Sequence, residues 1–152
     1  MNFRITLIYL QKITIGLLFL ITLSCEIQAD EVKPGTYMDL TKALQNPLNV
    51  RVLDLSGQNF TTLPKEIEKL KNLQKLYLFD NRLKTLPKEI GQLKNLQELN
   101  LSSNQLTTLP TEIGQLQNLQ WLYLQNNQFS FEEQERIRKL LPLKCKIIFE
   151  VY

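Results

Sequence analysis

A period of 23 residues runs through the chain from Val50 to Phe129 and limits its fold more than any other feature. Leu73, Leu96 and Leu119 are 23 residues apart, and Val50 stands one period earlier. A fixed period of this length is typical of solenoids, in which each repeat buries its apolar face against its neighbours. The same register recurs at the other apolar positions, which is why leucine accounts for 31 of 152 residues. The sequence therefore predicts four stacked repeats over residues 49–129.

Each repeat contains a short stretch in which leucines alternate with residues of other types. In residues 76–78 (LYL) the two leucines flank a tyrosine, which predicts a short strand with its leucines facing inward. Successive strands are then expected to stack in parallel. Asparagine recurs at the following turn, at Asn81, Asn104 and Asn127, and its amide can pair with backbone groups that the turn leaves free. We expect a buried asparagine ladder, with a less regular bend in the first repeat, where Gln58 stands at that position.

Proline recurs after the strand and turn of three repeats, at Pro64, Pro87 and Pro110. Proline disfavours a regular helix at the residue before it, so the segment that follows is expected to form about one helical turn.

The unit LQKLYLFDNRLKTLPKEIGQLKN resembles the leucine-rich repeat, whose signature is L-x-x-L-x-L-x-x-N-x-L, and the match covers Val50 to Phe129. The tail LPKEIGQLKNLQ is similar to the secreted 23-residue-repeat proteins of pathogenic spirochaetes. The resemblance implies an α/β leucine-rich-repeat solenoid, a short horseshoe with a parallel sheet on its concave face and helical caps at both ends. It also implies a bacterial envelope or extracellular context.

Residues on either side of the repeats have the sequence of end caps. Residues 30–48 predict a linker and an N-terminal helical cap, in which Thr36 caps a helix from Tyr37 to about Gln45. Residues 130–152 predict a helix-strand cap. Ser130 and Glu133 have capping-box spacing for a helix to about Leu141, and a covering edge strand follows from Cys145.

Residues 1–29 have the pattern of a secretory signal peptide. Arg4 and Lys12 precede an apolar run of 11 residues, from Ile13 to Leu23, which is shorter than the roughly 20 needed to span a bilayer. Two processing sites compete. Cleavage after Ala29 releases a free protein, whereas cleavage before Cys25, in a sequence resembling a lipoprotein box, leaves a lipidated and membrane-tethered one.

The cysteine count leaves one thiol in the mature chain. Cys25 is removed or lipidated, so Cys145 has no internal disulfide partner. We expect Cys145 to be a small buried hydrophobe, with a reactive or dimer-forming thiol as the alternative.

Side chains that alternate with the leucines are expected to form the concave face, and they include four aromatic residues. Trp and Tyr are the residues that most often anchor protein interfaces. The alternative is that these are ordinary strand residues and that Lys75 and Glu98 form only a cross-strand ion pair. The predicted partner-binding residues are Lys75, Tyr77, Phe79, Asp80, Glu98, Asn100, Trp121, Tyr123 and Gln125.

Several functional classes are disfavoured by what the sequence lacks. It contains no histidine, which removes Ser-His-Asp arrangements and imidazole metal sites, and it has no Gly-rich phosphate loop. We therefore expect no enzyme, cofactor or metal. The formal net charge is only +3, and acidic and basic residues are mixed along the chain, which argues against a nucleic-acid partner. A weak contact between lysines of the convex side and a polyanion or glycosaminoglycan is a further alternative.

The function predicted from these features is non-catalytic protein recognition by a secreted or surface-associated module, which is a monomer or weakly self-associating. The spirochaete resemblance implies a partner on host cells or in the extracellular matrix. The alternative is a structural or self-associating envelope lipoprotein without a host ligand, and membrane association is expected only if Cys25 is lipidated.

Overall fold

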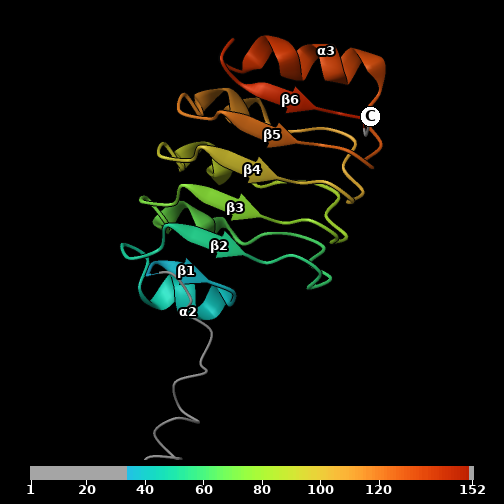
Figure 1. Cartoon of the computed structure of the whole chain (residues 1–152). Helices are drawn as coiled ribbons and strands as arrows, with labels where there is room; N and C mark the ends of the chain where they lie inside the picture. The colour runs from blue at the N-terminus through green and yellow to red at the C-terminus, as the bar shows by residue number, and fades with distance from the viewer. Residues whose placement is uncertain (1–33, 151–152) are drawn as a thin grey trace, which may run out of the picture. The chain divides into compact units, whose positions relative to one another are not determined.

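The computed structural model describes residues 34–150, and in this range the chain forms one solenoid around a six-stranded parallel sheet. The strands lie in sequence order, each paired with the next, as Figure 1 shows. They are β1 (Thr36–Tyr37), β2 (Val52–Asp54), β3 (Lys75–Tyr77), β4 (Glu98–Asn100), β5 (Trp121–Tyr123) and β6 (Lys146–Ile148). The proposed signal peptide, with Cys25, lies outside the described residues. No helix within residues 34–150 is both long enough and apolar enough to cross a membrane.

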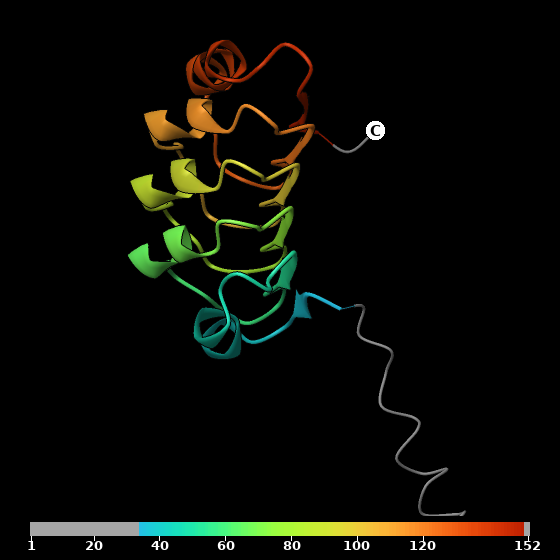
Figure 2. The ribbon, with the colours of Figure 1, turned by 90° about the vertical axis from the view of Figure 1, so that its left-hand side faces the viewer.

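Three short 3₁₀ helices run along the side opposite the sheet, which Figure 2 shows edge-on. They are η1 (Lys65–Lys69), η2 (Lys88–Gln92) and η3 (Thr111–Gln115). Each follows one of the three repeat prolines, whose backbone is extended, so the expected single turn begins directly after the proline. The packing between them is close. A Cβ atom on Gly91 would lie 2.5 Å from the backbone oxygen of Glu112, so only glycine fits where η2 meets η3.

The core between the strands and the 3₁₀ helices consists of the repeated leucines and isoleucines. Leu53, Leu76, Leu99 and Leu122 stand in one row across the sheet and are fully buried. Full burial of a leucine side chain contributes roughly 1.5–3 kcal/mol. The solenoid is therefore held together mainly by rows of identical side chains that pack on the repeat before and the repeat after.

The predicted asparagine ladder is present. Asn104 donates from Nδ2 to the backbone oxygens of Leu78 at 2.9 Å and Leu101 at 3.0 Å, and its Oδ1 accepts from the amide of Leu83 at 3.0 Å. Asn81 and Asn127 make the equivalent contacts in their own repeats. Each asparagine thus links its own turn to the preceding repeat.

The first repeat has the irregular bend that the sequence predicts. Gln58 stands at the position of the ladder asparagine, and its side chain donates to the backbone oxygen of Met38. Asn59 has a positive φ of 59°, a conformation that asparagine tolerates better than most residues. The first repeat also has a positive φ at Gly57, whereas each of the three later repeats has one such position, namely Asp80, Ser103 and Asn126.

The N-terminal cap differs from the sequence prediction. Its helix, α2 (Leu40–Gln45), begins three residues later than predicted, and its N-cap is Asp39, whose side chain accepts from the amide of Lys42 at 3.1 Å. Thr36 is not a cap. It lies in β1 opposite Val52, because the oxygen of Gly35 accepts from the amides of Arg51 and Val52 and joins this segment to the sheet.

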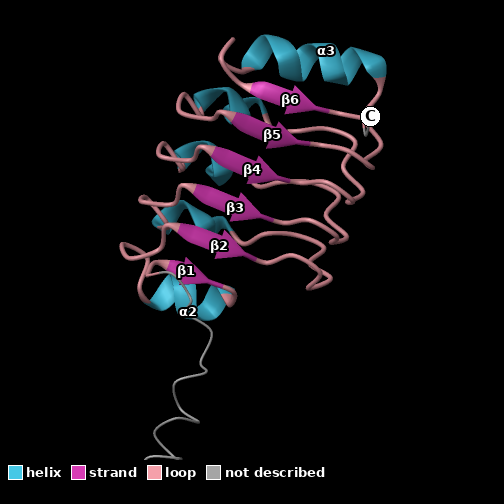
Figure 3. Cartoon of the chain, in the orientation of Figure 1, coloured by secondary structure: helices cyan, strands magenta, loops and turns pink. Residues whose placement is uncertain are grey.

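The C-terminal cap consists of α3 (Phe131–Leu140) and β6, and Figure 3 shows the helices that close both ends of the solenoid. Ser130 is the N-cap and accepts from the amide of Glu133. The reciprocal capping-box contact is absent, because the Glu133 carboxylate accepts instead from Thr108 Oγ1 at 2.8 Å and from the amide of Leu109 at 3.1 Å. Arg136 pairs with the same carboxylate. The helix is therefore attached to the preceding repeat through Glu133.

Cys145 lies immediately before β6, half-buried and packed against the core. Burial raises the pKa of its thiol to about 11, so very little of it is thiolate at neutral pH. Its environment fits the expected apolar role better than the alternative of a reactive thiol.

Candidate functional site

The strand residues that point away from the core form one continuous surface, which we call the sheet face. The register places Lys75, Glu98 and Trp121 side by side on successive strands. Tyr77, Asn100 and Tyr123 form the next row. The predicted rows are therefore adjacent in space. The sheet face comprises Val52, Asp54, Lys75, Tyr77, Glu98, Asn100, Trp121, Tyr123, Lys146 and Ile148, followed at the strand ends by Ser56, Phe79, Asp80, Ser102 and Gln125.

Lys75 and Glu98 form an ion pair at the centre of the sheet face. Lys75 Nζ lies 2.9 Å from Glu98 Oε2, and the carboxylate raises the pKa of the lysine, chiefly through this hydrogen bond. The two charges therefore compensate each other. Burial is the main cause that raises the pKa of the neighbouring Tyr77, so its hydroxyl is neutral under physiological conditions.

Two of the four aromatic residues of the sheet face lie on β5. The rings of Trp121 and Tyr123 stack with their centroids 6.3 Å apart and their planes 10° apart, and both side chains are half-buried. Lys146 Nζ lies 4.5 Å from the centroid of the Trp121 ring, within the range of a cation–π contact. These contacts hold the aromatic rings in defined positions, which lowers the entropy cost of using them in an interface.

Phe79 is the exposed aromatic residue of the sheet face. Its side chain follows β3 and is 45% exposed. Asp80 beside it is also exposed and has a positive φ of 54°. An apolar and an acidic side chain therefore project together from this edge of the face.

Some predicted site residues are engaged in local contacts. Asn100 Oδ1 accepts from the amide of Ser102 at 3.0 Å, as Asp54 Oδ1 does from the amide of Ser56. Gln125 Oε1 accepts from Ser102 Oγ at 2.7 Å. Asn100 and Gln125 therefore lie on the sheet face as predicted, but part of their hydrogen-bonding capacity is used in the turns.

Lys146 and Ile148 also belong to the sheet face, although the sequence indicated only a covering edge strand there. Their pairing with Trp121 and Tyr123 extends both rows by one strand. The signal was present in the alternation that begins at Cys145, because in a parallel strand the residues between the inward ones must join the exposed face.

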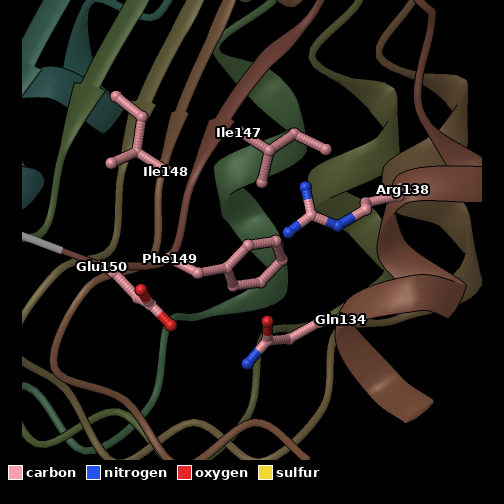
Figure 4. Close-up of a pocket in the computed structure, with 6 residues that line it drawn as sticks. All are labelled: Gln134, Arg138, Ile147, Ile148, Phe149 and Glu150. Atoms are coloured by element: carbon pink, nitrogen blue, oxygen red, sulfur yellow. The ribbon is translucent and has the colours of Figure 1, made fainter. Parts of the chain in front are cut away.

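A cavity of about 220 Å³ lies between β6 and α3, where Figure 4 shows Arg138 and Gln134 of the helix facing Ile147 and Phe149 of the strand segment. The guanidinium carbon of Arg138 lies 4.8 Å from the centroid of the Phe149 ring. That ring also meets Phe129 edge-on. Aromatic and cation–π packing line this cavity, so it is part of the junction between the last strand and the cap helix.

Within residues 34–150 no three histidine, cysteine, aspartate or glutamate side chains are grouped so that they could hold a metal ion.

Comparison with known proteins agrees with this architecture. The family described as "Leucine-rich repeat region" matches residues 35–147, and the chain belongs to the leucine-rich-repeat family. Proteins with this fold are generally non-catalytic modules that mediate protein–protein interaction. No curated protein matches the chain.

A solved structure of a leucine-rich-repeat protein from Leptospira interrogans is 57% identical in sequence, with a TM-score of 0.68. The match covers 75% of this chain and 28% of the Leptospira protein. This chain is therefore similar to a part of a longer repeat protein.

Proposed function

We propose that the chain is a non-catalytic recognition module that binds a protein partner through its sheet face. The observation that carries the proposal is the stacked Trp121–Tyr123 pair on an open surface, together with the exposed Phe79 and the half-buried Tyr77. Interface hot spots are enriched in Trp and Tyr. The side chains proposed to anchor the partner are Tyr77, Phe79, Trp121 and Tyr123, and those proposed to set its polarity are Lys75, Asp80 and Glu98.

We propose further that this module acts outside the cytoplasm, as a secreted or surface-associated protein, on a host-cell or matrix protein. The signal-peptide pattern of residues 1–29 supports export. Similarity to a Leptospira interrogans protein fits the spirochaete resemblance. The mass of the exported chain's N-terminus distinguishes cleavage after Ala29 from lipidation at Cys25.

The test is binding of the mature chain to a panel of matrix and cell-surface proteins, beside a Tyr77→Ala, Trp121→Ala, Tyr123→Ala variant. We expect a partner for the unmodified chain and a loss of more than about 2 kcal/mol in binding free energy for the variant, as for hot-spot residues. The matched control is Leu48→Ala, Phe131→Ala, Leu143→Ala, because these side chains are exposed and apolar but are not among the residues of the sheet face. Unfolding curves of all three proteins check their folds.

Equal loss in both variants, or binding that neither variant changes, would contradict recognition through the sheet face. If the chain binds no protein of the panel and its mass in solution rises with concentration, the alternative of a self-associating envelope protein is favoured. Sedimentation of the same preparations measures that mass.

A further inference from the structure

The charges of the sheet face are unevenly compensated. The ion pairs among residues 34–150 are Lys75–Glu98, Arg136–Glu133 and Arg138–Glu135. Within the same part of the chain, Lys144 and Lys146 have neither an acidic partner nor a hydrogen-bond acceptor for their ammonium groups, although both line one shallow pocket with Gln120 and Trp121. Two uncompensated positive charges therefore lie at the β6 end, Lys146 on the sheet face and Lys144 in the turn before β6.

The geometry of this pocket holds one of these charges in place. Lys146 pairs with Trp121 across the strands, and its ammonium lies 4.5 Å from the centroid of the indole ring. The ring is fixed in turn by its stacking on Tyr123. An ammonium over an aromatic ring keeps its N–H donors for a further acceptor, whereas the ammonium of Lys75 already donates to Glu98.

We propose that the pocket formed by Gln120, Trp121, Lys144 and Lys146 receives a carboxylate side chain from an acidic segment of the partner protein. This inference rests on the proposed function and identifies the chemistry of the partner. The two lysines and the side-chain amide of Gln120 supply donors for the carboxylate. Trp121 and Tyr123 supply the adjoining apolar surface for the neighbouring side chain of the same segment.

Charge complementarity favours a short acidic peptide over a sulfated polysaccharide. The affinity for a polyanion increases with the number of its charges that the protein neutralises, as in nucleic-acid binding, so a sulfated sugar favours a longer row of positive charges. The rest of the sheet face instead presents Asp54 and Asp80, and its other lysine is neutralised by Glu98. The uncompensated lysines on and beside the sheet face are thus Lys146 and Lys144, which suits one or two carboxylates.

The probe is a capped hexapeptide of alternating glutamate and leucine, with the glutamine–leucine peptide as its neutral counterpart. Trp121 is the single tryptophan of the chain, so its fluorescence reports on this pocket directly. We expect the acidic peptide to change the Trp121 emission and to bind about tenfold more tightly than the neutral peptide, which corresponds to two partly exposed charge pairs.

The matched variants are Lys144→Gln, Lys146→Gln for the pocket and Lys65→Gln, Lys88→Gln for the 3₁₀-helix side. Both pairs remove two exposed positive charges. We expect the first pair to weaken binding of the acidic peptide about tenfold and the second to change it less than about twofold. Calorimetry supplies a second readout, since Lys146→Gln also removes the contact on the indole ring.

Three results would overturn the inference: equal affinity for the acidic and neutral peptides, equal effects of the two variant pairs, or a heparin oligosaccharide that binds the same lysines more tightly than the acidic peptide. Each leaves the proposed function intact as long as the Tyr77, Trp121, Tyr123 variant still loses its protein partner. The proposed function itself fails if the Tyr77, Trp121, Tyr123 variant binds the protein partner as tightly as the unmodified chain does.

Discussion

Asparagine at the repeat turn shows how one side chain can stabilise a repeat. Asn104 is nearly fully buried and satisfies backbone groups in its own repeat and in the one before it. No buried polar side-chain atom among residues 34–150 lacks a partner. A turn inside a solenoid has no water to replace such an amide, so the ladder is required wherever the turn is covered on both sides.

Asn104→Ala is predicted to destabilise the protein by about 1–3 kcal/mol, because it leaves the buried Leu83 amide without its acceptor. The oxygens of Leu78 and Leu101 each lose one of two donors and keep the bond from Asn81 or Asn127. Urea unfolding measures the change. The control is Gln105→Ala at the adjacent exposed position, which is expected to change stability by less than about 0.5 kcal/mol. Similar effects of both substitutions would show that the ladder has no special energetic role.

The cap helix α3 is fixed to the repeats by a polar contact rather than by apolar packing alone. Glu133 leaves the capping box and binds Thr108, Leu109 and Arg136, while Ile137 supplies the buried apolar contact of the helix. The pKa of Glu133 is lowered to about 2, first by its hydrogen bond with Arg136. The folded structure therefore stabilises the ionised form of the Glu133 carboxylate.

This contact predicts a specific pH dependence. The pKa of Glu133 is lower in the folded chain, at about 2, than its ordinary value of 4.5, so the stabilisation is complete above about pH 5 and is lost as the pH falls toward 2. Arg136 is partly exposed and solvent screens the pair, so we expect a loss of about 1–2 kcal/mol rather than the full linkage value. Unfolding free energies measured from pH 6 to pH 2 give the curve.

Glu133→Gln should remove this part of the pH dependence. The control is Glu135→Gln, which lies on the same helix in a more exposed pair with Arg138 and should keep the pH dependence of the unmodified chain. If Glu133→Gln and Glu135→Gln had the same pH profile, the Glu133 contact would not be what attaches the cap.

The solenoid as a whole is built from contacts between neighbouring repeats, with 3₁₀ helix on 3₁₀ helix and strand on strand. A central repeat is therefore covered on both sides, and an end element only on one. Stability in such a chain is roughly a sum of repeat and interface terms, so it should be greatest at the centre.

Hydrogen exchange should follow this gradient. We predict that the amide of Leu101, which donates to the Tyr123 oxygen in the next repeat, exchanges at least about tenfold more slowly than the amides of β1, the two-residue strand at one end. Exchange measured on peptides from residues 96–104 and 35–40 makes the comparison. Equal protection in both peptides would mean that the described part of the chain unfolds as one unit.

The repeat period made most of the fold and the rows of the sheet face predictable. In a solenoid each residue contacts its counterpart one period away, so sequence spacing translates directly into spatial neighbours. That is why Lys75 beside Glu98, Tyr77 beside Asn100 and the asparagine ladder could be inferred before the structure was known.

The ends of the solenoid could not be inferred in the same way, because each cap occurs once and its local signals compete with contacts to the repeats. Thr36 looks like a helix cap but pairs with β2 through the Gly35 turn. Glu133 has capping-box spacing but binds the preceding repeat. Lys146 reads as a charge that protects an edge strand, and only its register with β5 places it over Trp121. The repeating pattern thus determined the core and the face, whereas packing against the last repeats determined the caps and the charged end of the proposed site.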